Sequence, residues 1–176
     1  MILTKRPFIL VLTVLCATGN AEPQHEHAEI TQQLGSVHFQ ISCQSAVQET
    51  FGRGVALLHS FWYEEAQKAF QTVLRDDSRC AMAHWGLAMA QWHQFADWPD
   101  ADATKVTQQA LAIAETLNAS PRERAYISAL AHFFSDSDGQ ERLQRATLYS
   151  QAMSRIYEEY PQDTEAGAFY ALSSRF

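Results

Sequence analysis

The chain has 176 residues, of which 47% are hydrophobic and 19% are charged, and its formal net charge is −7. This composition is sufficient to bury a core, and 7 Gly and 5 Pro are few for a β protein with many tight turns. The acidic balance, without a run of basic residues, argues against nucleic acid as a partner.

Residues 1–21 have the features of a secretory signal peptide. Lys5 and Arg6 precede an apolar run over residues 8–17, which is too short to cross a bilayer as a helix. Small residues before a cleavage site predict cleavage after Ala21. We therefore expect an exported protein, periplasmic or secreted, with no membrane insertion after cleavage. A membrane anchor, or a lipoprotein modified at Cys16, is the alternative.

The next two segments lack a helical period. Residues 22–33 are polar, contain His25 and His27, and are predicted to form a flexible lead. Residues 34–41 alternate between apolar and polar side chains, which is typical of an extended chain. We expect this short extended segment to lie along the first helix.

From residue 45 onward the hydrophobic period is that of α-helices. The predicted helices cover residues 45–61, 63–74, 81–93, 103–117, 121–134, 140–159 and a last helix that Asp163 caps. Ser120 and Glu123 form a capping box with Pro121 at the first helical position, which indicates a helix start. The chain is thus predicted to be all-α.

Apolar faces can be predicted for two of the later helices. For the fourth helix the residues expected to point inward are Val106, Ala110, Ile113, Ala114 and Leu117. For the sixth helix they are Leu143, Ala146, Tyr149, Met153, Ile156 and Tyr160.

An internal repeat is visible in the first three helices. Gly54, Leu57 and the pair Ala66-x-x-x-Phe70 match the small and large positions of a tetratricopeptide repeat, and Gly86 follows Gly54 at an offset close to the family period. Ser78 departs from the proline usual at its position. The stretch from the Ser-Cys before the first helix through residues 81–89 resembles the amino-terminal part of longer exported bacterial tetratricopeptide-repeat proteins.

The resemblance covers about residues 34–172 and implies a fold and a class of function. We expect residues 34–176 to form an antiparallel helix-pair α-solenoid of about three repeats plus an unpaired C-terminal helix. Because the relatives are longer, the chain is expected to be a short form or a fragment. The implied function is that of a scaffold or adaptor, binding an unknown protein or peptide in the groove lined by the first helix of each pair.

The groove positions follow from the register of Gly54 and Gly86. The candidate partner-binding residues are Gln48, Phe51, Val55, Leu58, His59, His84, Leu87 and Gln91.

No catalytic motif is recognised in the sequence, so we expect no enzymatic activity and no cofactor. The alternative is a metal carrier that binds copper through thioether and imidazole groups. Met82, Met89 and His93 fall near one helical stripe and are the candidate ligands. Methionines at helical spacing are also common core residues.

Cys43 and Cys80 remain after signal cleavage, and both precede the first helix of consecutive repeats. Successive first helices of this architecture pack side by side, which brings their starts together. Export would supply an oxidising compartment. We therefore predict a Cys43–Cys80 disulfide, with two buried free thiols as the alternative.

Overall fold

The computed structural model describes residues 34–93, 101–134 and 142–174. Within these residues the chain is all-helical, as predicted, and has no strand. A short 3-10 helix, Ser45–Val47, comes before the first α-helix. The α-helices are α1 (Gln48–His59), α2 (Tyr63–Asp76), α3 (Ala81–Gln91), α4 (Ala101–Thr116), α5 (Pro121–Phe134), α6 (Arg142–Glu159) and α7 (Thr164–Ser173). The predicted signal peptide and flexible lead, residues 1–33, lie outside the described residues.

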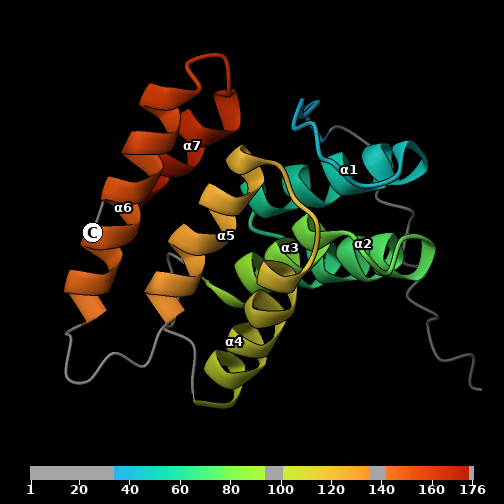
Figure 1. Ribbon diagram of the computed structural model, residues 1–176, viewed down its shortest axis with the longest axis horizontal. Coiled ribbons are helices and arrows are strands. Elements are labelled where there is room, and N and C mark those ends of the chain that lie inside the picture. The colour runs from blue at the N-terminus through green and yellow to red at the C-terminus, as the bar shows by residue number, and fades with distance from the viewer. Residues whose placement is uncertain (1–33, 94–100, 135–141, 175–176) are drawn as a thin grey trace, which may run out of the picture. The chain divides into compact units, whose positions relative to one another are not determined.

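Consecutive helices pack against each other along the chain (Figure 1). In addition, α3 contacts both α1 and α5, so these three alternate helices lie side by side. The even-numbered helices each pack between the odd-numbered helices that flank them in sequence. The side chains of α1, α3 and α5 therefore share one region of the molecule.

The ring of Phe70 on α2 lies where α1 and α3 come close to each other. A Cβ atom added to Gly54 on α1 would come within 2.7 Å of the Phe70 ring, and one added to Gly86 on α3 within 2.5 Å. Both distances are far below van der Waals contact, so the ring needs a glycine on each neighbouring helix. The two glycines of the predicted repeat thus lie against the same aromatic ring.

Two helix starts predicted from the sequence are confirmed by their hydrogen bonds. The Glu123 main-chain N–H donates to Ser120 Oγ at 3.3 Å, and the Ser120 N–H donates to Glu123 Oε2 at 2.7 Å, which is a capping box. Asp163 caps α7 by accepting from the N–H groups of Glu165 and Ala166. These contacts satisfy donors that a helix N-terminus leaves free.

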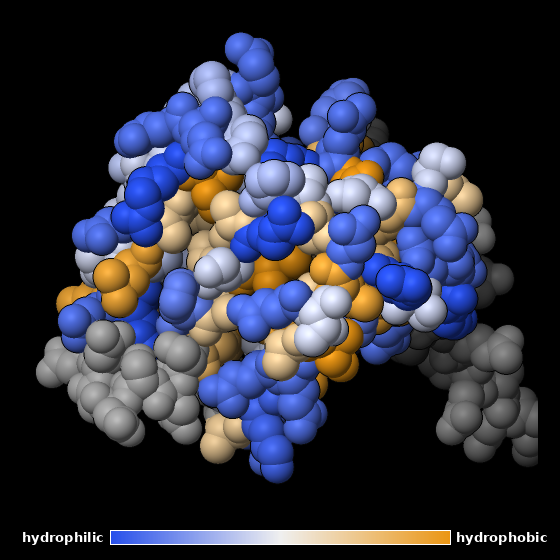
Figure 2. Space-filling model, in the orientation of Figure 1, coloured by the Kyte–Doolittle hydropathy of each residue, from blue (hydrophilic) through white to orange (hydrophobic). Residues whose placement is uncertain are grey.

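The predicted inward faces of α4 and α6 are partly wrong. Val106 and Ile113 on α4 are 56% and 48% exposed, whereas Thr107 and Leu111 are buried. The apolar stripe of α4 is wider than its packed side, and the hydroxyl of buried Thr107 is satisfied by the carbonyl of Ala103 in the preceding turn. The face drawn in Figure 2 is mostly hydrophilic, with small groups of hydrophobic residues between the polar ones.

On α6, the predicted residues Ala146, Tyr149, Met153 and Ile156 are buried. Leu143, in the first turn of α6, is 58% exposed, so it does not belong to the packed face. Tyr160, just beyond the helix, is partly buried against the core.

The C-terminal helix packs against the rest of the described residues. α7 packs against α6, and the ring of Phe169 reaches three other helices. Its centroid lies 5.5 Å from that of Trp85 on α3, 6.5 Å from Tyr126 on α5 and 4.9 Å from the His59 ring on α1. α7 is therefore part of the main core of the described residues.

Cys43 and Cys80 form the predicted disulfide, with their sulfur atoms 2.00 Å and their Cα atoms 5.0 Å apart. Cys80 is fully buried at the start of α3. The helices described here are all too short or too polar to span a membrane.

Candidate functional site

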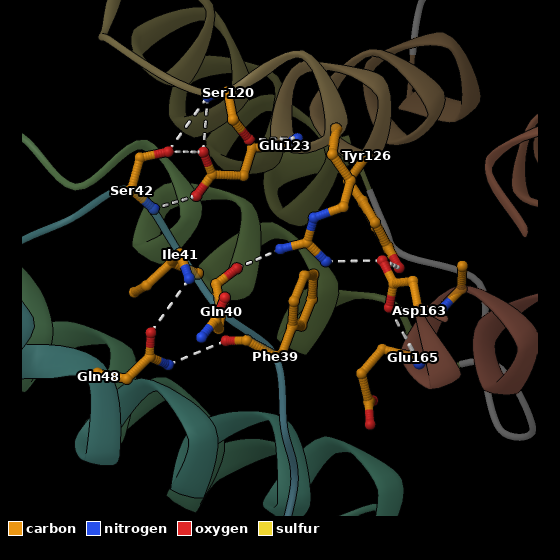
Figure 3. Close-up of polar contacts among 12 residues, drawn as sticks. Phe39, Gln40, Ile41, Ser42, Gln48, Ser120, Glu123, Tyr126, Asp163 and Glu165 are labelled. Carbon is orange, nitrogen blue, oxygen red and sulfur yellow. Dashed lines mark hydrogen bonds and ion pairs between the residues drawn. The ribbon is translucent and has the colours of Figure 1, made fainter. Parts of the chain in front are cut away.

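A short stretch without regular secondary structure, residues 37–42, lies between α1 and α5; we call it the anchored segment (Figure 3). Its side chains alternate in burial as the sequence predicts. Phe39 is 1% exposed and Val37 and Ile41 are partly buried, whereas His38 and Gln40 are exposed. One side of the segment is thus committed to the core and the other faces solvent.

Phe39 inserts among aromatic rings from three helices. Its ring centroid lies 5.6 Å from Phe51 on α1, 5.8 Å from Trp85 on α3 and 5.0 Å from Tyr126 on α5. The guanidinium of Arg122 lies over the Phe39 ring at 4.7 Å, a cation–π arrangement. The segment therefore has one aromatic anchor held by α1, α3 and α5 together.

The main chain of the anchored segment is held by side chains of the helices on both sides. Gln48 Nε2 donates to the Phe39 carbonyl at 2.9 Å, and the Ile41 N–H donates to Gln48 Oε1 at 3.1 Å. From the opposite side, Arg122 donates to the carbonyl of Gln40. These contacts use main-chain groups of the segment. Any residue could supply the two carbonyl groups, and any residue except proline could supply the N–H group.

Glu123 joins the end of the segment to the start of α5. Its carboxylate accepts from the Ser42 N–H at 2.6 Å, from the Ser42 hydroxyl, and from the Ser120 N–H at 2.7 Å. Burial by itself would raise the pKa of Glu123, but the hydrogen bonds from Ser42 and Ser120 outweigh it and lower the pKa below its usual value. The residue is therefore held as a carboxylate although its side chain is buried.

Beyond Ser42 the chain is fixed covalently. Cys43 is bonded to Cys80, and the Gln44 N–H donates to Asp77 Oδ2 at 2.9 Å. Both partners lie at the junction of α2 and α3. The C-terminal end of the anchored segment is thus tethered beside the start of α3.

The N-terminus of α7 adds a second polar cluster around the same residues. Asp163 Oδ2 accepts from Arg122 Nη1 at 2.6 Å and from the Tyr126 hydroxyl at 2.9 Å. Burial, reinforced by the charge of Asp163, raises the pKa of Tyr126, so this phenol stays a hydrogen-bond donor. Arg122 is therefore shared between α7 and the anchored segment.

A neighbouring contact joins α7 to α1. His59 Nε2 and Glu165 Oε2 are 2.6 Å apart, and the His59 ring stacks on Phe169. The first and the last of the described α-helices, α1 and α7, thus contact each other beside the face shared by α1, α3 and α5.

The predicted groove residues differ in their burial and in what they contact. Phe51, Val55 and Leu58 are buried core residues and have almost no surface to offer a partner. Gln48 and Phe51 contact the anchored segment, and His59 contacts α7. The α3 residues His84, Leu87 and Gln91 are partly buried, and burial lowers the pKa of His84.

The residues of the alternative metal site lie in different surroundings. Met82 and Met89 are buried in the core, where Met89 Sδ accepts from the Tyr149 hydroxyl at 3.9 Å. His93 is exposed and stacks on Tyr63 with centroids 4.4 Å apart. Among the residues that the structure describes, no three His, Cys, Asp or Glu side chains gather to form a metal site.

Several residues of this site were not predicted from the sequence as binding residues, namely Arg122, Tyr126 and Glu165. Glu123 and Asp163 were predicted only as helix caps, and Phe39 only as the apolar side of an extended segment. A signal did exist for Glu123, since a capping-box carboxylate has lone pairs left for a second partner. The identity of that partner depends on tertiary packing.

No family model, curated protein or solved structure matches the chain.

Proposed function

We propose that the chain is a non-enzymatic scaffold or adaptor, built from tetratricopeptide-type helix pairs, that binds an extended peptide or a protein partner on the face shared by α1, α3 and α5. The observation that carries this proposal is the way the anchored segment is held. Gln48 and Arg122 bind its main chain from two sides, while an aromatic cluster takes one side chain. A face with these properties has the chemistry needed to hold an extended polypeptide.

The packing around Phe70 supports the repeat architecture. Gly54 and Gly86 are 32 positions apart and are close to the same ring from neighbouring helices. In a solenoid each unit buries its apolar face on the next unit, so a recurring glycine at the helix contact is expected. Export of the protein belongs to the same proposal, and the Cys43–Cys80 bond supports it because such bonds persist in oxidising compartments.

Site-specific photocrosslinking in cells that export the chain tests the proposal. A crosslinking amino acid at His84 or Gln91 on α3 should give an adduct with a discrete protein or peptide. The matched control is the same amino acid at Lys68, an exposed position of α2. Adducts from α3 and none from α2 are expected, whereas equal labelling from both helices, or none from α3, would contradict the proposal.

A further inference from the structure

The anchored segment has the contacts of a bound peptide although it belongs to the same chain. It makes no helix or strand, and its main-chain groups bond to Gln48, Arg122 and Glu123, which are all side chains of other elements. One aromatic side chain enters the core, and its neighbours on both sides face solvent. These are the features by which a folded domain recognises an extended ligand.

The contacts also define what kind of peptide the face accepts. The ring of Phe39 is enclosed by Phe51, Trp85 and Tyr126, so the anchor must be a flat apolar ring. Arg122 over that ring favours an aromatic rather than an aliphatic anchor. Val37 and Ile41, two residues to each side of the anchor, are partly buried and set an alternating apolar pattern.

We propose that the face shared by α1, α3 and α5 is a binding site for extended peptides with a phenylalanine anchor flanked at two residues' distance by aliphatic side chains, and that residues 37–42 are its intramolecular occupant. This inference rests on the proposed function and names its ligand class. The disulfide at Cys43 keeps the occupant next to its site. A tethered ligand has an effective concentration in the millimolar range. While the tether is intact, a short free peptide therefore competes poorly, and only a partner that binds more tightly than such a peptide displaces the segment.

A nicked form of the full chain tests this directly. A protease site inserted between Gln44 and Ser45 allows the main chain to be cut after folding, and the Cys43–Cys80 bond then holds the segment to the rest of the protein. Dithiothreitol reduces that bond and leaves the segment held only by non-covalent contacts. The probe is a fluorescent synthetic peptide with the sequence of residues 34–42, which contains no cysteine.

The peptide is expected to bind the nicked and reduced protein and to displace the original segment, as seen by fluorescence anisotropy. The nicked but oxidised protein, which has the same composition, should not bind it. A control peptide with Phe39→Ala should bind about tenfold or more weakly, because a buried aromatic anchor dominates such contacts. Equal binding of both peptides would overturn the inference.

The inference also fails if the nicked and reduced protein loses its helical circular dichroism, because the segment would then be an inseparable part of the fold. That outcome leaves the photocrosslinking result at His84 and Gln91 unaffected. The opposite result is also informative. If the nicked and reduced protein binds the peptide but no crosslinked adduct forms on α3, the peptide-binding site is supported and the proposed function is contradicted. The two failures are therefore distinguishable.

Discussion

Glu123 is the residue that joins the anchored segment to the start of α5. Its carboxylate completes the cap of α5 through Ser120 and binds both the N–H and the hydroxyl of Ser42. A buried carboxylate is stable only when such donors compensate for lost hydration. The sequence shows the cap, but it cannot show that Ser42, 81 residues away, supplies the other donors.

The lowered pKa of Glu123 makes its contribution to stability dependent on pH. A carboxyl group whose folded-state pKa is below its ordinary value of 4.5 stabilises the fold above that pH, and the contribution is lost as the pH falls through the folded-state pKa. Glu123→Gln should lower the unfolding free energy at neutral pH by about 1–3 kcal/mol. Urea denaturation at several pH values should show the difference from wild type shrinking below pH 4.5. A difference independent of pH would contradict the assigned role.

The glycines around Phe70 give a second test at the scale of single residues. Gly86→Ala would place a methyl group 2.5 Å from a fully buried ring. We expect a loss of about 1–3 kcal/mol in unfolding free energy, measured by thermal or urea denaturation. Gly52→Ala is the matched control, because its Cβ would meet only a carbonyl oxygen at an ordinary 3.5 Å. That variant should be neutral or more stable by roughly 0.5–1 kcal/mol, since alanine favours the helix. Equal destabilisation by both would argue against the Phe70 contact.

At the scale of elements, α7 differs most from what its sequence suggests. A ten-residue helix is marginal on its own, and its residues alone point to packing on α6. In the structure Asp163 caps it and binds Arg122, and Phe169 joins the aromatic cluster of α1, α3 and α5. Long-range contacts thus stabilise a helix that local signals leave weak.

Phe169→Ala should therefore release α7 from the core. Truncating a buried phenylalanine costs about 3–5 kcal/mol, which corresponds to a loss of protection of two orders of magnitude or more. Hydrogen exchange measured by mass spectrometry should show this loss over residues 164–173, and Phe169→Leu should lose much less. Exchange in the wild type at the rate of an unstructured chain would contradict the packing of α7.

The disulfide links the end of the anchored segment covalently to the start of α3. Cys43 and Cys80 are 37 residues apart, and closing a loop of that size stabilises by about 3–4 kcal/mol on the chain-entropy model. Mass spectrometry of the non-reduced exported protein should find no alkylatable thiol at either position. Reduction should lower the melting temperature of the wild type but not that of a Cys43→Ser/Cys80→Ser variant. Two free thiols in the native protein would rule the bond out.

For the molecule as a whole, the all-α class, the helix order and the Cys43–Cys80 pairing could be predicted from the sequence. Hydrophobic period and caps are local signals, and they locate the helices to within a few residues. The rotation of a helix about its own axis depends on the helices packed against it, which a local pattern does not show. For this reason Val106 and Ile113 on α4 are exposed and Thr107 is buried. The occupation of the α1–α3–α5 face by the chain's own residues also depends on tertiary packing.

Residues 37–42 lie like a bound peptide on the face shared by α1, α3 and α5. The most direct measurement is a nuclear Overhauser experiment on the folded, oxidised protein with labelled aromatic residues. Cross-peaks are predicted between the ring protons of Phe39 and those of Tyr126 and Trp85, whose centroids lie 5.0 Å and 5.8 Å away. Random-coil chemical shifts for residues 37–42, with no cross-peak from the Phe39 ring to either partner, would contradict it.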